Sequence, residues 1–127
     1  MHVEKFAARY NGNCIIRPYG FVHNVEVMMS ASDCIISKPG GLTVSEALAK
    51  NLPMLLADPI PGHEERNVDF LVNNGMAALI TKHFPVDEAV YELFTNPVRL
   101  ETVRHTMKAV AHPDATERLA DFVLALK

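Results

Sequence analysis

Short apolar runs without polar alternation recur along this chain, and they constrain its fold more than any other feature. Each run is only a few residues long and is bounded by Gly, Pro or Asn. Such runs are typical of strands that are buried on both faces of a parallel sheet. We therefore predict about four strands, at Cys14-Ile15-Ile16, Asp33-Cys34-Ile35-Ile36, Pro53-Met54-Leu55-Leu56-Ala57 and Ala77-Ala78-Leu79-Ile80.

Segments with helical spacing lie between these runs. The alternation of strands and helices with short links predicts an α/β fold, a Rossmann-like parallel sheet with flanking helices. Residues 97–127 are predicted to form one or two closing helices, broken at His112-Pro113. The other predicted helices are Val3–Tyr10, Val25–Ala31, Thr43–Lys50, Glu64–Asn74 and Val86–Phe94, and the buried stripe expected on the closing helices comprises Val98, Val103, Met107, Val110, Leu119, Phe122, Val123 and Leu126.

Charge and composition exclude several classes of protein. The formal net charge of −3 argues against non-specific nucleic-acid binding, which depends on concentrated positive charge. No apolar run approaches the ~20 residues of a membrane-spanning helix, and the first residues do not form a signal peptide. Cys14 and Cys34 lie within apolar runs, so we expect buried free thiols in a reducing compartment. Together these features predict a cytoplasmic globular domain.

A glycine pair between a predicted strand and a predicted helix is the most informative local feature. Gly40-Gly41 follows Ser37-Lys38-Pro39 and precedes Leu42-Thr43-Val44-Ser45-Glu46. Free backbone N–H groups and the positive end of the helix dipole converge at such a point, and the absence of a Cβ lets a phosphate approach closely. The same residues also fit a simple turn followed by a capping box, with Thr43 at the N-cap and Glu46 three residues later.

A second polar stretch, residues 58–67, follows the third predicted strand. Its ionisable side chains could hold a polar ligand at a strand end. His63-Glu64 begins a zinc-protease motif, but that motif needs a second histidine at position 67, where this chain has Asn67. We therefore predict no metal site. The stretch is equally consistent with a proline-rich loop whose acidic residues favour a helix N-terminus.

A third stretch, Tyr19-Gly20-Phe21-Val22-His23-Asn24, follows the first predicted strand. An aromatic ring at this place could stack on a nucleotide base or pack within the loop. The residues alone leave both possibilities open.

Three stretches form a specific pattern when they are taken together. Residues 32–47 are Ser-Asp-Cys-Ile-Ile-Ser-Lys-Pro-Gly-Gly-Leu-Thr-Val-Ser-Glu-Ala, residues 52–56 are Leu-Pro-Met-Leu-Leu, and residues 61–67 are Pro-Gly-His-Glu-Glu-Arg-Asn. The pattern resembles the C-terminal, donor-binding domain of GT-B glycosyltransferases. It is most similar to processive diacylglycerol glucosyltransferases and monogalactosyldiacylglycerol synthases, from about residue 10 to about residue 110.

The resemblance implies a nucleotide site for the diphosphate and ribose of a UDP-sugar donor. By match to the family motif, backbone N–H groups of Gly40, Gly41, Leu42 and Thr43 would face the diphosphate. Glu46 would accept hydrogen bonds from the ribose hydroxyls. The family resemblance implies no cofactor beyond this substrate and no bound metal.

The resemblance also implies contacts to the base and to the donor sugar. Phe21 and Val22 match the segment that holds the uracil, by ring contact and main chain. His63, Glu64 and Asn67 match the stretch that touches the sugar. Relatives often have Gln where this chain has His63, so the chain departs from the pattern at the sugar.

Chain length sets the last expectations. Relatives carry a separate domain for the lipid acceptor and two further strand–helix units, so residues 1–127 match a partial UDP-sugar-binding domain. We expect this chain alone to transfer no sugar, and no catalytic acid or base is assigned. The alternative is a non-catalytic remnant that pairs with another chain. An apolar edge at Cys14-Ile15-Ile16 would favour a homo-oligomer or a partner chain, and the full-length enzyme would act at the membrane surface.

Overall fold

A parallel sheet of three strands forms the centre of the computed structural model, which describes residues 2–126. The strands are β1 (Ile35–Ser37), β2 (Met54–Leu56) and β3 (Ala77–Leu79), and they lie in the order β1-β2-β3. In the register of the sheet, Ile35 lies opposite Met54, and Met54 lies opposite Ala77. All three residues of β2 are buried, as an apolar strand in the middle of a parallel sheet must be. The predicted α/β class is confirmed.

The predicted strand at Cys14-Ile15-Ile16 is wrong. Residues 10–24 contain no strand or helix, Ile15 is 80% exposed and Cys14 is exposed, so the predicted burial of Cys14 is wrong as well. Cys34, in contrast, is half-buried. A short apolar run becomes a strand only when a neighbouring strand accepts its backbone hydrogen bonds, and this run joins no ladder in the described sheet.

Seven helices account for most of the remaining described residues, 2–126. Their bounds agree with the predicted ones to within about two residues, and the predicted break at His112-Pro113 separates the last two. The helices are α1 (His2–Arg9), α2 (Val25–Ser30), α3 (Gly41–Ala49), α4 (Glu65–Asn73), α5 (Val86–Thr95), α6 (Pro97–Val110) and α7 (Ala115–Ala125).

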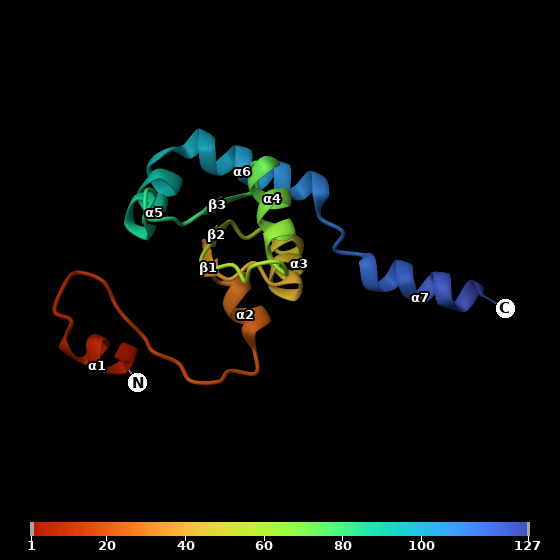
Figure 1. Cartoon of the computed structure of the whole chain (residues 1–127). Coiled ribbons are helices and arrows are strands. Elements are labelled where there is room, and N and C mark those ends of the chain that lie inside the picture. The colour runs from red at the N-terminus through yellow and green to blue at the C-terminus, as the bar shows by residue number, and fades with distance from the viewer. Residues whose placement is uncertain (1, 127) are drawn as a thin grey trace.

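Helices cover both faces of the sheet. Met54 and Leu56 point to the face that α3 and α4 cover, and they join the main apolar core. Leu55 points to the opposite face, because side chains alternate along a strand, and it packs with Ala89 and Leu93 of α5. Figure 1 shows α3 and α4 on one side of the three strands and α5 on the other.

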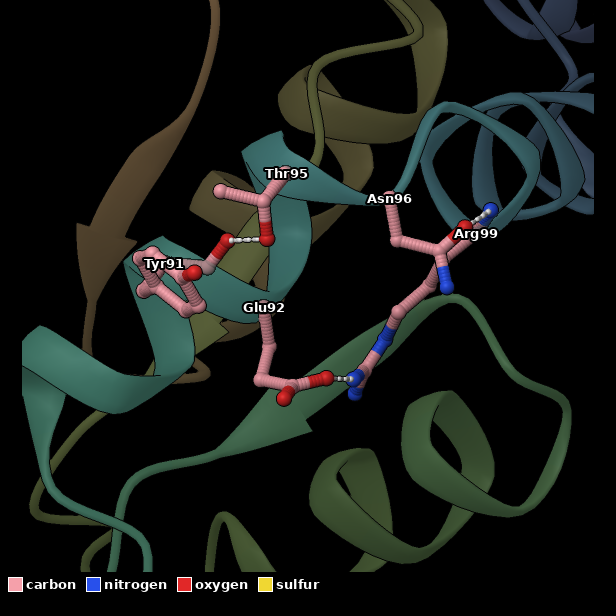
Figure 2. Close-up of polar contacts among 5 residues, drawn as sticks. All are labelled: Tyr91, Glu92, Thr95, Asn96 and Arg99. Carbon is pink, nitrogen blue, oxygen red and sulfur yellow. Dashed lines mark hydrogen bonds and ion pairs between the residues drawn. The ribbon is translucent and has the colours of Figure 1, made fainter.

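The corner between α5 and α6 is held by local polar contacts. The side-chain oxygen of Asn96 accepts a hydrogen bond from the backbone N–H of Arg99 over 3.1 Å and so caps α6, which begins with Pro97. The Arg99 guanidinium pairs with the Glu92 carboxylate on α5 at 3.0 Å (Figure 2). From this corner α6 runs over the sheet and places Met107 in the main core.

The two end helices lie outside the core. Neither α1 nor α7 has a buried residue, and α7 projects away from the rest of the chain (Figure 1). The predicted buried stripe is therefore correct at Met107 but wrong at Val98, which is 72% exposed, and wrong throughout α7. Periodicity predicts an apolar face on α7, but no residue of α7 joins either apolar core cluster of the structure. No helix of residues 2–126 combines the length and the apolar character needed to cross a membrane.

Candidate functional site

The loops that follow β1 and β2 lie at one edge of the sheet. Both strands are parallel, so their carboxyl ends point the same way, and this edge is where open α/β sheets bind ligands. The first loop is residues 38–40, which lead into α3. The second is residues 57–64, which lead into α4. These are the two stretches that the sequence singled out.

The N-terminus of α3 is open to solvent. Gly40 is its N-cap, with φ −66° and ψ 143°, and no side chain caps the helix. The first helical hydrogen bond runs from Val44 N–H to the Gly40 carbonyl over 2.9 Å. The N–H groups of Gly41, Leu42 and Thr43 therefore precede the first intrahelical partner and are available to an external acceptor.

The glycine pair keeps this end of the helix accessible. A β-carbon built on Gly41 would have no heavy atom within 4 Å, and Leu42 is 83% exposed. The alternative capping box is wrong, because α3 begins two residues earlier than Thr43, at Gly41. Thr43 is instead the third residue of the helix, and Glu46 lies one turn further on, exposed to solvent.

The second loop has an unusual backbone. Asp58, two residues after the end of β2, has a φ of +44°, and Gly62 has a φ of +79°. Positive φ is uncommon for a residue with a side chain. The Glu64 carboxylate closes the loop, because its Oε2 accepts a hydrogen bond from the backbone N–H of Ile60 over 2.8 Å.

Two contacts join the second loop to the first. Nδ2 of Asn67 donates a hydrogen bond to the Pro39 carbonyl over 2.7 Å. Oε1 of Glu64 lies 3.6 Å from the place that a β-carbon on Gly40 would take. The structure thus brings Glu64 and Asn67 to the start of α3.

Other predicted site residues are not brought there. Phe21 lies in the irregular segment before α2, is 88% exposed, and packs edge-on against His23 with ring centroids 4.9 Å apart. Val22 is half-buried in the same segment, and His63 is exposed on the second loop. Their roles toward the base and the sugar stay predictions.

Sequence reasoning missed Pro39 and Ile60. Pro39 is fully buried, and its carbonyl is the group that Asn67 holds. The Ile60 N–H is the group that fixes the Glu64 carboxylate. Both act through the backbone, which no side-chain motif reports. The proline directly before the glycine pair was the one available signal.

A separate cavity of about 480 Å³ lies between α6 and the strands β2 and β3. Its walls are mostly apolar, and none of its lining residues belongs to either loop. Its two most polar side chains already have partners: Arg99 pairs with Glu92, and the Thr102 hydroxyl donates to the Val98 carbonyl. The cavity therefore contributes nothing to the loop site.

Among residues 2–126, two ionisable groups have perturbed pKa values, and neither lies in the two loops. Burial raises the pKa of the Cys34 thiol, and the negative charge of Asp33 raises it further. A hydrogen bond with Cys14 raises the pKa of the exposed Tyr10 hydroxyl. Within residues 2–126, no three His, Cys, Asp or Glu side chains are grouped so that they could hold a metal ion.

Comparison with known proteins gives consistent matches. The family model for the glycosyltransferase family 28 C-terminal domain matches residues 2–119. A processive diacylglycerol beta-glucosyltransferase of Bacillus cereus (strain AH187) is 31% identical over 110 residues, which is 87% of this chain. The enzyme of the same description from Bacillus pumilus (strain SAFR-032) is 34% identical over 95 residues, 75% of this chain. The chain spans 28% and 25% of these two relatives' lengths.

Solved structures have the same fold. MurG from Acinetobacter baumannii superposes on 98% of this chain and 39% of its own, with a TM-score of 0.74 and 25% identity. The glycosyltransferase SnogD from Streptomyces nogalater covers 87% of this chain and 29% of its own, with a TM-score of 0.60 and 21% identity. The sheet, the flanking helices and their order are therefore those of the GT-B C-terminal domain.

Proposed function

The chain belongs to the glycosyltransferase family 28 C-terminal domains. From this premise we propose that it binds the UDP-sugar donor of a glycosyltransferase that makes glycolipids. Its relatives include diacylglycerol glucosyltransferases. The same family match makes a non-catalytic module the less favoured alternative.

The observation that carries the proposal is the uncapped N-terminus of α3. Three backbone N–H groups and the positive end of the helix dipole meet there, at the carboxyl edge of a parallel sheet. A diphosphate supplies the negative charge and the acceptor oxygens that such a site lacks. In the transfer reaction, these N–H groups would stabilise the charge that develops on the diphosphate leaving group as a lipid hydroxyl attacks the sugar.

Glu46 is proposed to bind the ribose. It lies one turn after Leu42 and Thr43 on α3 and is exposed. Helical side chains tilt toward the N-terminus of their helix, so its carboxylate is directed back toward the open end of α3. An ionised carboxylate accepts hydrogen bonds from a pair of neighbouring hydroxyl groups, which a ribose offers.

The remaining contacts are proposed from the family pattern. Phe21 and Val22 would hold the uracil, and this requires the segment before α2 to lie against the bound nucleotide. His63, Glu64 and Asn67 would contact the donor sugar from the second loop. We propose no metal or other cofactor.

The activity of a whole glycosyltransferase is a further proposal, because this chain spans only about a quarter of its relatives' length. We propose a lipid acceptor of the diacylglycerol type and a cytoplasmic site at the membrane surface. Transfer requires both substrates to be held together in a reactive geometry, and we propose that this chain alone does not transfer sugar. A second copy or another chain would then be its partner.

Calorimetry with UDP tests the proposal directly. The chain should bind UDP weakly and should prefer it to uridine, because most of the binding would come from the diphosphate. Replacing Glu46 by Gln should weaken binding by roughly a factor of 10, as expected for the loss of a charge-assisted hydrogen bond. Glu101→Gln, an exposed residue of α6, is the matched control and should leave affinity unchanged. Equal affinity for UDP and uridine would refute a diphosphate site at α3.

A further inference from the structure

Asn67 makes a contact that the proposed ligand roles do not use. It lies in the first turn of α4, half-buried, and its Nδ2 donates to the Pro39 carbonyl over 2.7 Å. The two residues are 28 positions apart in the chain. A carbonyl oxygen can only accept, so the N–H side of the Asn67 amide must face Pro39.

The contact fixes a peptide plane at the start of α3. The C=O of Pro39 and the N–H of Gly40 belong to one planar peptide unit, in which they point in opposite directions. Holding the carbonyl therefore sets the direction of the Gly40 N–H. Glycine has the most conformational freedom of any residue, so an external restraint reduces the backbone freedom of Gly40 and Gly41 more than it would for other residues.

Resting on the proposed function, we propose that Asn67 is a positioning residue for the diphosphate site. It acts through the Pro39 carbonyl and orients the Gly40 N–H, which precedes the free N–H groups at the start of α3, before the ligand arrives. Donors that are already oriented bind more tightly, because less freedom is lost on binding. Asn67 does not have to touch the diphosphate for this role.

The two possible roles of Asn67 differ in which ligand they affect. A positioning role acts on the diphosphate, so its loss weakens the binding of UDP as well as the binding of UDP-glucose. A direct contact with the donor sugar affects UDP-glucose alone. Comparing the two ligands therefore separates the roles in one set of titrations.

The chain offers a matched control on the same helix. Nδ2 of Asn74, just after α4, donates to the Phe70 carbonyl over the same distance, 2.7 Å, far from the loops. Asn67→Ala and Asn67→Leu should each bind UDP about three- to tenfold more weakly, which corresponds to the loss of one hydrogen bond, and UDP-glucose at least as much more weakly. Asn74→Ala should bind both ligands like the unaltered chain. A loss of affinity confined to UDP-glucose, or unchanged affinity for both ligands in the Asn67 variants, would overturn the positioning role.

A measurement without ligand tests the restraint of Gly40 by Asn67 independently of the proposed function. The ¹⁵N order parameter of Gly40 should be close to that of rigid backbone, about 0.85, and should fall toward about 0.6 in both Asn67 variants. It should not change in Asn74→Ala. Asn67→Leu keeps a side chain of similar size and adds no charge, so it remains informative if Asn67→Ala does not fold. If the unaltered chain binds no UDP, the proposed function fails, whereas an unchanged order parameter in the variants refutes the restraint itself.

Discussion

Oε1 of Glu64 lies 3.6 Å from the position of a β-carbon on Gly40, so a carboxylate stands beside the N–H groups that would receive a diphosphate. Its other oxygen is fixed by the Ile60 N–H at 2.8 Å. The charge is therefore held in place by the second loop and cannot simply swing away. Like charges a few ångströms apart repel one another even close to solvent.

Replacing Glu64 by Gln should tighten UDP binding by roughly two- to fivefold at low salt, because it removes this repulsion. Gln keeps an oxygen that can accept from Ile60 N–H, so the loop should be preserved. The gain should shrink as ionic strength rises, since salt screens charges near the surface. Calorimetry at two salt concentrations measures this, with Glu65→Gln, an exposed neighbour, as control. An unchanged UDP affinity would place the diphosphate away from Gly40.

Gly41→Ala should separate stability from binding. A β-carbon there meets no heavy atom within 4 Å, and Ala favours the helix, so the free energy of unfolding should rise by about 0.5 kcal/mol. The same methyl group would occupy the space through which a phosphate approaches the backbone. UDP affinity should therefore fall by roughly a factor of 10. Urea denaturation measures the expected gain in stability, and calorimetry measures the expected loss of UDP affinity. A UDP affinity equal to that of the unaltered chain would contradict the expected loss.

Asn96→Ala should lower the free energy of unfolding by about 1 kcal/mol, the usual effect of losing a helix N-cap. The Asn96 side chain accepts the Arg99 N–H at the start of α6, next to the ion pair between Arg99 and Glu92 (Figure 2). Asn73→Ala, at an exposed position at the end of α4, is the control. The effect should appear as a lower urea midpoint of unfolding. A midpoint equal to that of the control would mean that the Asn96 cap does not contribute to stability.

Cys34 should react with thiol reagents more slowly than Cys14. Burial, and then the negative charge of Asp33, raise the pKa of Cys34, so less of the reactive thiolate is present at any pH below that pKa. Its reaction rate should continue to rise with pH above the ordinary thiol pKa. Reaction of Cys14→Ser and Cys34→Ser with Ellman's reagent between pH 7 and about pH 10 isolates each thiol. Equal rates in the folded protein, where Cys14 is exposed, would contradict the burial of Cys34.

The three strands of the sheet could be predicted because each is a short apolar run next to a segment with helical spacing, which is the pattern of an α/β fold. Cys14-Ile15-Ile16 has the same composition but no adjacent strand in the structure, and composition does not report neighbours. Periodicity likewise showed that α7 has an apolar face, but not whether any surface covers it. The glycine pair located the candidate site. The contact between Asn67 and Pro39 could not be predicted, because it joins two segments that only the folded sheet brings together.

The lack of buried residues in α1 and α7 defines the cooperative folding unit of this chain. Every residue of the main core lies between Met29 and Met107, so the unit extends from α2 to the end of α6. The flanking segments contribute no residue to this core, and they should open without it. A protease should therefore trim both ends of the folded chain and stop at a fragment of residues 25–111, whose unfolding free energy equals that of the whole chain.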